Sequence, residues 1–485
     1  MPPAVLAAID AQREETLADL LRLVAQPSIS AQDIGIQECA QLEMELLRKA
    51  GLGPRLLETT GHPMVYAESL KAPGKPTVLF YGHYDVQPPD PLELWLSPPF
   101  EPEIREGRIY GRGVADNKAQ HFSHIAAIRA WLTATGSLPV NVKVLLEGEE
   151  EVGSPHLDEA VDRYRDLLTA DLVYTSDGPV TDDQYPEISF GVRGLLYIEL
   201  RATGPNRDLH SGHWGGVAPN PIWTLVRALN TMLDAHNRVL INGFYDNVSE
   251  PTPGARAAME ALPFDIGEAI GRIGLTEMTP PADLPYADRI MAQPTLNIAG
   301  FTGGYGGPGS KTIIPSTATV KIDMRLVPDQ HPDEIWEKVS IHIAEHAPEV
   351  EVVRLDGGMI PSYTPVEHPL ADVVRDAIET GFGKRPIDIP LVGGSLPDAV
   401  WTKTLGLPSF LVSYGDPAQA NHSPNESYAV ARIWQGIHTS AALLAGLADS
   451  LPVIPRKEES APLDTGKAGE CFAGAQHDGK RDTMA

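Results

Sequence analysis

The chain has 485 residues, of which 42% are hydrophobic and 21% are charged, and its formal net charge is −27. This length predicts roughly two or three domains' worth of core, and the composition is typical of a globular protein. The acidic balance argues against nucleic acid or an anionic membrane as a partner. No apolar run in the sequence is long enough to cross a membrane.

The chain contains only two cysteines, Cys39 and Cys471. Two cysteines in such different contexts exclude a disulfide scaffold and a zinc site built from thiolates. Any metal must therefore be held by His, Asp and Glu. The N-terminus also lacks the charged-then-apolar pattern of a signal peptide. We therefore expect a cytoplasmic protein.

Residues 1–187 alternate between helical and strand patterns. Helices are predicted at 4–26, 33–50, 116–133 and 155–169. Strands are predicted at 63–69, 76–81, 141–147 and 171–176. This alternation indicates an α/β sheet with helices on both faces. Since ligands bind at the carboxyl ends of the strands in such folds, we interpret 1–187 as the first part of a catalytic domain.

The pattern changes near residue 188. Residues 189–202 and 316–327 alternate as strands, and helices are predicted at 219–235 and 332–347. One face of the second strand carries Val320, Ile322, Met324 and Leu326. The segment 240–310 is rich in Pro and Gly and has little periodicity. We interpret 188–360 as an α+β domain inserted into the first one.

The α/β pattern resumes after residue 360. It comprises a helix that ends at Gly381, a buried strand at 408–413 and a helix from about 425 to 447. We interpret 361–452 as the second part of the catalytic domain. Residues 453–485 hold many charges and few large apolar side chains. We expect this segment to be a disordered tail.

A histidine and an aspartate follow the predicted strand at 76–81. They are His83 and Asp85, two positions apart after Gly82. If the strand continues that far, alternation puts both side chains on one face. The Asp85 carboxylate would then hold the imidazole of His83 in one tautomer, and the other ring nitrogen would be free to bind a metal. On its own this short pattern is more often structural than catalytic.

Four further stretches carry acids or a histidine near strand ends or turns. They are Gly-Arg-Gly-Val-Ala-Asp116, Glu147-Gly-Glu149-Glu150-Glu151, Ser176-Asp177 and His422-Ser-Pro-Asn-Glu426. Each has an ordinary explanation, such as a helix cap, a solvated acidic loop or a turn. Together they supply two histidines and several carboxylates, which suit a pair of divalent ions. Burying those carboxylates without cations would be prohibitively costly.

In combination these motifs resemble the M20 family of metallopeptidases, close to its carnosinase-like, cytosolic nonspecific dipeptidase branch. The resemblance covers about residues 10–450. It implies that Asp116 bridges two metal ions, with His83 and Asp177 on one ion and Glu151 and His422 on the other. It also implies Glu150 as general base and Asp85 as the residue that orients His83. The peptide bond after the bridging aspartate is often cis in relatives. One departure is Asn117, where many relatives carry a second aspartate.

The resemblance also assigns the inserted domain a role in dimerisation and in closing over the substrate. It implies that His210, in Asp-Leu-His-Ser-Gly-His, reaches the active site of a neighbouring subunit. Asn220, Thr312 and Arg325 resemble positions that hold the substrate's carboxylate or reacting carbonyl. Ser395, in Gly-Gly-Ser-Leu-Pro, resembles part of a loop that binds the substrate's C-terminal end. We therefore expect a homodimer with His210 contributed in trans.

The expected function is hydrolysis of the amide bond of dipeptides or similarly small peptides by a metal-bound hydroxide, with Glu150 as general base. Two divalent ions per subunit are expected, zinc foremost, with manganese and cobalt as alternatives. An N-acyl-amino-acid deacylase or a carboxypeptidase on the same scaffold is the first alternative, and a non-catalytic binding protein is the second. His121 and His124 lie three apart on a predicted helix. We expect them at the surface or near the substrate rather than on a metal.

Overall fold

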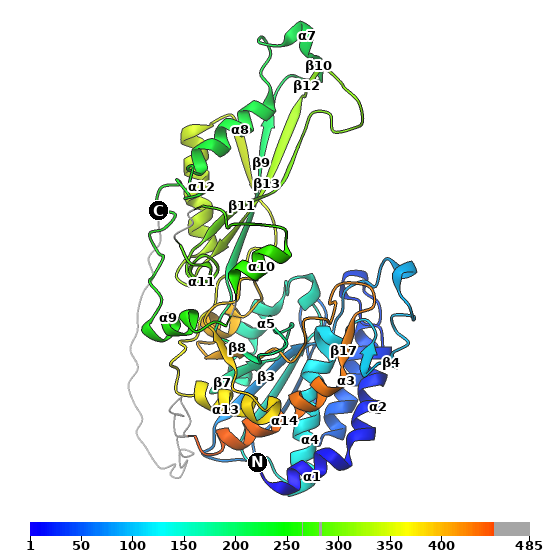
Figure 1. The fold of residues 1–485 in the computed structure, drawn as a ribbon. Coiled ribbons are helices and arrows are strands. Elements are labelled where there is room, and N and C mark those ends of the chain that lie inside the picture. The colour runs from blue at the N-terminus through cyan, green and yellow to red at the C-terminus, as the bar shows by residue number, and fades with distance from the viewer. Residues whose placement is uncertain (264, 281–283, 451–485) are drawn as a thin grey trace, which may run out of the picture. The chain divides into compact units, whose positions relative to one another are not determined.

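The computed structural model describes residues 1–263, 265–280 and 284–450. The predicted tail, 453–485, lies outside these described residues. The described strands form one large sheet, a second sheet of four strands and two small ones (Figure 1). Among the described residues no helix is both long and apolar enough to cross a membrane.

The large sheet contains eight strands. In spatial order they are β1 (Arg55–Leu57), β2 (Met64–Ser69), β6 (Asn141–Glu147), β3 (Thr77–His83), β7 (Leu172–Thr175), β16 (Ser409–Leu411), β8 (Glu187–Ser189) and β15 (Ile387–Ile389). The four central strands β6, β3, β7 and β16 run parallel to one another. Their carboxyl ends therefore meet at one edge of the sheet.

The large sheet is buried on both faces. Along β3, Val78 and Phe80 pack into one apolar cluster, whereas Leu79 and Tyr81 pack into another. The first cluster includes residues of α1 (Pro3–Ala11), α2 (Arg13–Ala25), α3 (Ile36–Lys49), α4 (Ala119–Thr135), α13 (Ala371–Phe382) and α14 (Val430–Leu447). The second includes residues of α5 (Leu157–Arg163) and α6 (Arg165–Leu168). The predicted α/β fold class, with helices on both faces, is confirmed.

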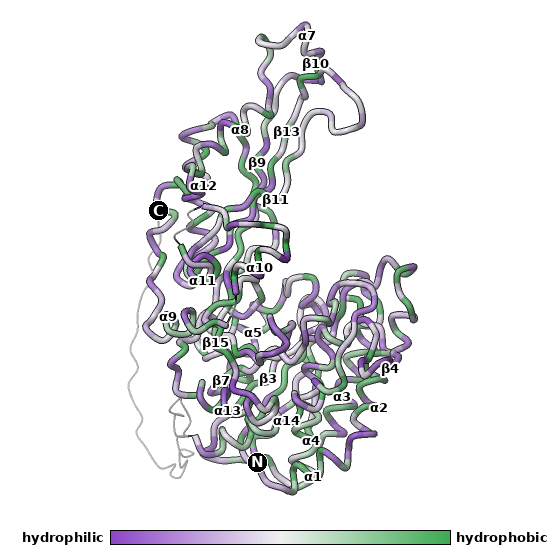
Figure 2. Tube along the Cα trace, in the orientation of Figure 1, coloured by the Kyte–Doolittle hydropathy of each residue, from purple (hydrophilic) through white to green (hydrophobic). Residues whose placement is uncertain are grey.

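The second sheet is antiparallel throughout. Its order is β11 (Thr295–Gly303), β13 (Thr317–Leu326), β9 (Gly194–Thr203) and β14 (Val350–Arg354). The predicted face of β13 is confirmed, because Val320, Ile322, Met324 and Leu326 are all fully buried. They pack against residues of α8 (Pro221–Met232) and α12 (Pro332–His346). Green segments in Figure 2 run through β3 and β9, one strand from each sheet.

The segment 240–310 is more regular than its sequence suggests. It contains α9 (Pro253–Glu260), α10 (Ile266–Arg272) and α11 (Tyr286–Met291), each too short to give a clear helical period. Ala255 of α9 belongs to the core of the large sheet. Arg256 Nη1 contacts Asp288 Oδ1 at 2.5 Å and so ties α9 to α11. This part of the predicted insert therefore packs with the large sheet. The boundaries of a separate domain at 188–360 remain a prediction.

Several predicted elements are divided in the structure. The helix predicted at 4–26 is interrupted at Gln12, and the one at 155–169 is interrupted at Tyr164. The strand predicted from 189 is two strands, because the chain passes from one sheet to the other at Gly191. A Cβ there would lie 2.3 Å from the carbonyl oxygen of Ser362. The last helix begins at Val430 rather than about 425, after the short strand β17 (Ser427–Ala429).

Candidate active site

The predicted ligand residues lie at the carboxyl ends of the parallel strands. His83 is the last residue of β3, and Asp177 follows β7. Glu151 lies in a short turn after β6. Asp116 lies in the π-helical turn Val114–Lys118 that leads into α4, and His422 lies between β16 and β17. The structure therefore brings together residues that are more than 300 positions apart.

The backbone around Asp116 is held by Glu426, which follows His422 in the same loop. The Glu426 carboxylate accepts hydrogen bonds from the backbone N–H groups of Gly113, Ala115 and Asp116, at 2.8–3.1 Å. It also accepts one from Arg112 Nη1 at 2.6 Å, and both side chains are fully buried. The Asp116–Asn117 peptide bond is cis, as the resemblance implied. One carboxylate thus couples the turn that carries Asp116 to the loop that carries His422.

The two oxygens of Asp116 face different histidines. Oδ1 lies 3.2 Å from His83 Nε2, and Oδ2 lies 3.1 Å from His422 Nε2. Asp177 Oδ2 completes the first group at 3.5 Å from His83 Nε2. Glu151 Oε2 completes the second at 3.2 Å from His422 Nε2. Two clusters of three residues therefore share one carboxylate.

This donor set fits two metal ions. The ligand atoms of a tetrahedral zinc site lie about 3.3–3.4 Å apart when each bond is about 2.0–2.1 Å long, close to the separations seen here. His83 Nε2 is buried and has no hydrogen-bond partner among the described residues, although it points at carboxylate oxygens. Possible ligand atoms of His83, Asp116 and Glu151 all lie within 4.8 Å of one another. Imidazole nitrogens and carboxylate oxygens are ligands for zinc, and carboxylates also suit manganese.

The electrostatics of the cluster also favour bound cations. Burial raises the pKa of both Glu150 and Glu151, because no fixed positive charge compensates them fully. Burial alone would lower the pKa of His83, but the carboxylates around it, Glu150 first, raise that pKa well above its usual value. Hydrogen bonding to Asp116 and Glu151 raises the pKa of His422 to about 10. Without bound cations, the carboxylates favour the protonated, positively charged form of both imidazoles. Bound divalent ions would supply that positive charge instead.

Asp85 joins two parts of the cluster. Strand β3 ends at His83, but Asp85 Oδ1 still lies 3.4 Å from His83 Nδ1, the ring nitrogen that faces away from Asp116. Its two oxygens also accept hydrogen bonds from the backbone N–H groups of Glu150 and Glu151, at 3.2 and 3.0 Å. Asp85 is fully buried. It can therefore orient His83, as expected, and it also fixes the acidic turn, which the sequence did not reveal.

Glu150 and Glu151 occupy different environments. Glu150 lines a cavity of about 970 Å³, together with Asp116, Asp177 and His422. Glu151 is not among the residues that line it. The Glu151 carboxylate instead accepts a hydrogen bond from Gln87 Nε2 at 2.9 Å and faces His422. The two neighbouring carboxylates therefore differ in their surroundings: Glu150 faces the cavity, whereas Glu151 faces Gln87 and His422.

The predicted substrate-binding residues fall into two groups. Ser395 lines the cavity, and Arg325, which does not line it, donates from Nη1 to Ser395 Oγ at 2.9 Å. His210, Asn220 and Thr312 are absent from the cavity lining. His210 Nδ1 accepts from the N–H of Gly212 at 3.0 Å, capping α7 (Ser211–Trp214), and Asn220 caps α8. A role for these three in a neighbouring subunit remains a prediction.

Three polar residues around the site were missed in the sequence. Asn421 Nδ2 donates to Asp116 Oδ2 at 3.2 Å, and Gln87 Nε2 donates to Glu151. Both are close in sequence to a predicted ligand or to Asp85, which was the available signal. Arg193 donates from Nε to the carbonyl oxygen of Gly393 at 2.9 Å, beside Ser395. Nothing local in Gly-Val-Arg193-Gly indicated that contact.

The expectation for His121 and His124 was wrong. Both are 1% exposed, inside the core rather than at the surface or the cavity. His121 Nε2 lies 2.9 Å from Glu43 Oε1, and His124 stacks on Phe80 with ring centroids 4.6 Å apart. Every residue of α4 from Ala119 to Trp131 is buried, so the polar residues of this stretch face other elements and not solvent. A helical spacing of three does not distinguish these situations.

Comparison with known proteins identifies the family. Residues 79–446 match the family described as peptidase family M20/M25/M40. The chain belongs to this family. The M20 enzyme is therefore a metallopeptidase that hydrolyses peptide bonds, and the family implies use of a divalent metal.

Relatives and solved structures resemble the M20 enzyme over most of its length. It is 28% identical over 458 residues to beta-Ala-His dipeptidase of Homo sapiens, covering 88% of this chain and 89% of that protein. It is 29% identical over 471 residues to Cys-Gly metallodipeptidase dug1 of Schizosaccharomyces pombe, covering 92% and 98%. The crystal structure of an M20 family metallo-carboxypeptidase from Sulfolobus solfataricus shares 35% identity with a TM-score of 0.81, covering 90% and 99%.

Proposed function

We propose that this M20 enzyme is a dipeptidase that hydrolyses the amide bond of dipeptides or similarly small peptides with two divalent cations. The observation that carries the proposal is Asp116, whose two oxygens each face one histidine at 3.1–3.2 Å. The names of the human and the fission-yeast relatives, beta-Ala-His dipeptidase and Cys-Gly metallodipeptidase, support the substrate class.

In this proposal Asp116 holds both cations. His83 and Asp177 hold one of them, and Glu151 and His422 hold the other. We propose zinc, with manganese and cobalt as alternatives that the same His and carboxylate donors accept. When bound, a pair of divalent cations polarises the substrate carbonyl and lowers the pKa of water. Asp85 keeps Nε2 of His83 directed at the site by contacting Nδ1.

Glu150 moves the proton. Its carboxylate lines the cavity, so it is positioned to accept a proton from the attacking water at Oε and to deliver it to the leaving amine. Burial raises its pKa in the absence of cations, and bound cations would favour the ionised form that a base requires. Glu150 therefore acts first as base and then as acid within one turnover.

The substrate's free carboxylate would bind at Ser395, which lines the cavity. Arg325 and Ser395, hydrogen-bonded to each other at 2.9 Å, supply a cation and a hydroxyl there. A guanidinium suits a carboxylate because it donates two parallel hydrogen bonds. We further propose a homodimer in which His210, with Asn220 and Thr312, completes the partner's site. The scarcity of cysteines supports a cytoplasmic location.

A carboxypeptidase is the second candidate. The solved structure with 35% identity is named a metallo-carboxypeptidase, and both activities require a free C-terminal carboxylate. The cavity of about 970 Å³ also has room for more than a dipeptide. The two functions differ in whether a third residue on the N-terminal side is accepted.

The deciding experiment measures kcat/KM for matched dipeptides, tripeptides and N-acetyl amino acids after zinc, manganese or cobalt has been added. We expect the dipeptides to be cleaved best. Faster release of the C-terminal residue from tripeptides would favour the carboxypeptidase. Cleavage of N-acetyl amino acids alone would replace both with a deacylase. No hydrolysis of any amide by the metal-loaded protein would overturn the proposed function.

A further inference from the structure

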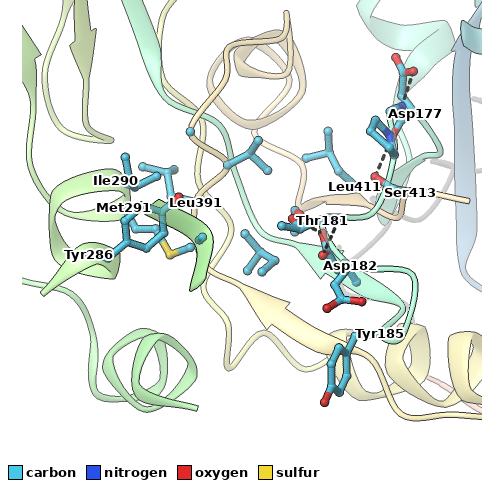
Figure 3. Close-up of a pocket in the computed structure, with 18 of the residues that line it drawn as sticks. Asp177, Thr181, Asp182, Tyr185, Tyr286, Ile290, Met291, Leu391, Leu411 and Ser413 are labelled. Carbon is cyan, nitrogen blue, oxygen red and sulfur yellow. Dashed lines mark hydrogen bonds between the residues drawn. The ribbon is translucent and has the colours of Figure 1, made fainter. Parts of the chain in front are cut away.

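One wall of the cavity is apolar, and the segment that formed no clear pattern in the sequence builds most of it. Tyr286, Ile290 and Met291 come from α11, and Leu391 comes from the loop after β15. Figure 3 shows these four side chains grouped together, on the opposite side of the view from Asp177 and Ser413. Ile266, Ile270 and Ile273, in and just after α10, extend the apolar lining.

This wall adjoins the loop that carries Gly393 and Ser395. Ile290 packs on Gly393, where an added Cβ would lie 3.1 Å from Ile290 Cγ2 and 3.7 Å from Arg193 Nη2. Arg193 donates to the carbonyl oxygen of Gly393, and two residues further on Ser395 receives a hydrogen bond from Arg325. The wall therefore packs against the short loop that carries Ser395.

The positive charge of the buried Arg193 side chain is only partly compensated by its surroundings. It is 7% exposed, and its Nη1 has no hydrogen-bond partner among the described residues. Burial first and then the charge of Arg325 lower the pKa of Arg193 to about 10, and the Asp323 carboxylate offsets part of this effect. Asp323 Oδ2 lies 3.9 Å from Arg325 Nε and offsets part of the charge of the two guanidinium groups, and one further anion beside them would still be favoured. A carboxylate at Ser395 would meet that need.

The proposed carboxylate site determines which part of a substrate faces the wall. If the terminal carboxylate lies at Arg325 and Ser395 and the reacting carbonyl lies near Glu150, the backbone of the C-terminal residue spans the space between them. Its side chain then has the apolar wall on one side. None of Tyr286, Ile290, Met291 and Leu391 carries a charge that could pair with an ionic side chain. Asp265, Glu268 and Arg272 also line the cavity, but they are exposed, and Glu268 pairs with Arg272 at 2.6 Å.

We propose that this wall binds the side chain of the substrate's C-terminal residue and that the enzyme prefers a large apolar residue, such as leucine, methionine or phenylalanine, at that position. The inference rests on the proposed function, because it assumes that an amide with a free C-terminal carboxylate is the substrate. Burying one large aliphatic side chain corresponds to a preference of about 10- to 100-fold over serine.

The first test compares dipeptides of alanine in both orders. We expect kcat/KM for Ala-Leu, Ala-Met and Ala-Phe to exceed that for Ala-Ser, Ala-Asp and Ala-Lys by about 10- to 100-fold. The reversed series, Leu-Ala against Ser-Ala, should vary less. Equal rates across the Ala-X series, or a stronger dependence in the X-Ala series, would overturn this inference and leave the dipeptidase intact. No hydrolysis of any member would overturn both.

The second test changes Met291, which lines the cavity. Ile290 is left unchanged because it packs on Gly393, in the loop that carries Ser395. Met291→Ser should reduce the Ala-Leu to Ala-Ser ratio about 3- to 10-fold, and Met291→Leu should preserve it. Met291→Lys should raise the relative rate for Ala-Asp. The matched control is Ile341→Ser on α12, an exposed position outside the cavity lining, which should leave every ratio unchanged. Unchanged ratios in all three Met291 variants would overturn the inference.

Discussion

Two regions of this molecule carry predicted catalytic residues, and these residues differ in burial and in their contacts. At the carboxyl ends of the large sheet, His83 is 1% exposed and Asp116 is 8% exposed, and their side chains lie within 3.2 Å. In the other region, strands β10 (Leu209–His210) and β12 (Ile313–Ile314) pair as a two-residue ladder beside α7. His210 is exposed there and stacks on His213, with ring centroids 4.7 Å apart.

The difference shows how much of a site one chain can build. Strand ends, the Asp85 contacts and the Glu426 contacts position the first group from several sides within a single subunit. The second group has a local hydrogen bond from Gly212 to His210, which would hold the imidazole in place even without a catalytic role. A buried cluster of carboxylates needs a ligand to make it stable, whereas an exposed histidine does not.

The largest effect is expected from the strand-end cluster. Replacing any one of His83, Asp116, Glu151, Asp177 or His422 with Ala should lower activity more than about 100-fold, because even loss of a residue that only orients a ligand costs about 10- to 100-fold. Chelation should inactivate the wild type, and added zinc, manganese or cobalt should restore it. Metal content by mass spectrometry should fall in each variant. Full activity in metal-free protein would show that the strand-end cluster is not a catalytic metal site.

Within that cluster, Glu150→Gln and Glu151→Gln should differ in their effects on turnover and on metal binding. Glu150→Gln removes the base and keeps its volume, so turnover should fall by about 10²-fold or more while both metals stay bound. Glu151→Gln should weaken the binding of one metal, since Glu151 faces His422 at 3.2 Å. The measurement is metal stoichiometry beside kcat. Variants that match in both quantities would show that the two roles are wrongly assigned.

His210→Ala tests the second region. Loss of a hydrogen-bond donor to the developing oxyanion should lower kcat by about 10²- to 10³-fold, without loss of metal. Mixing His210→Ala with Glu150→Gln should form heterodimers in which one site has both wild-type residues. Such heterodimers should recover up to half the activity of the wild-type dimer. Absence of recovery, with heterodimer demonstrated by differently tagged chains, would place His210 in its own subunit or outside catalysis.

The smallest effects concern stability. Asn117 is fully buried, and its Nδ2 donates to the carbonyl oxygen of Ser176 at 2.7 Å. A carboxylate cannot donate that bond, so Asn117→Asp should lower the free energy of unfolding by about 1–3 kcal/mol, measured by urea denaturation. The matched change in the other region, His213→Ala, removes an exposed side chain and should stay within about 0.5 kcal/mol. Equal stability of the two variants would remove the contrast between the regions.

Much of the cluster was readable from the sequence because each residue sits beside a strong local signal. An apolar run before His83 and a strand before Asp177 place these side chains at strand ends, and a glycine-rich turn places Asp116 just before a helix. The face of β13 was readable for the same reason, since alternation over ten residues is unambiguous. These signals need only neighbours along the chain.

The sequence was a poor guide where contacts come from distant segments. Arg193, Glu426 and the wall at Tyr286–Met291 acquire their surroundings from loops far away in the chain, and short helices such as α11 have too few turns to show a period. His121 and His124 were misjudged because α4 is covered on every side.

The sequence by itself determined the alternation of strands and helices, the side chains that follow the strands and the family to which they belong. Only the tertiary structure decided that Asp116 faces one histidine with each oxygen, that Asp85 fixes the acidic turn and that Glu150 rather than Glu151 lines the cavity. Periodicity depends on residues a few positions apart, and the chain records it directly. The orientation of a carboxylate side chain depends on hydrogen-bond donors that folding brings together from distant segments. No local sequence pattern shows which donors these are.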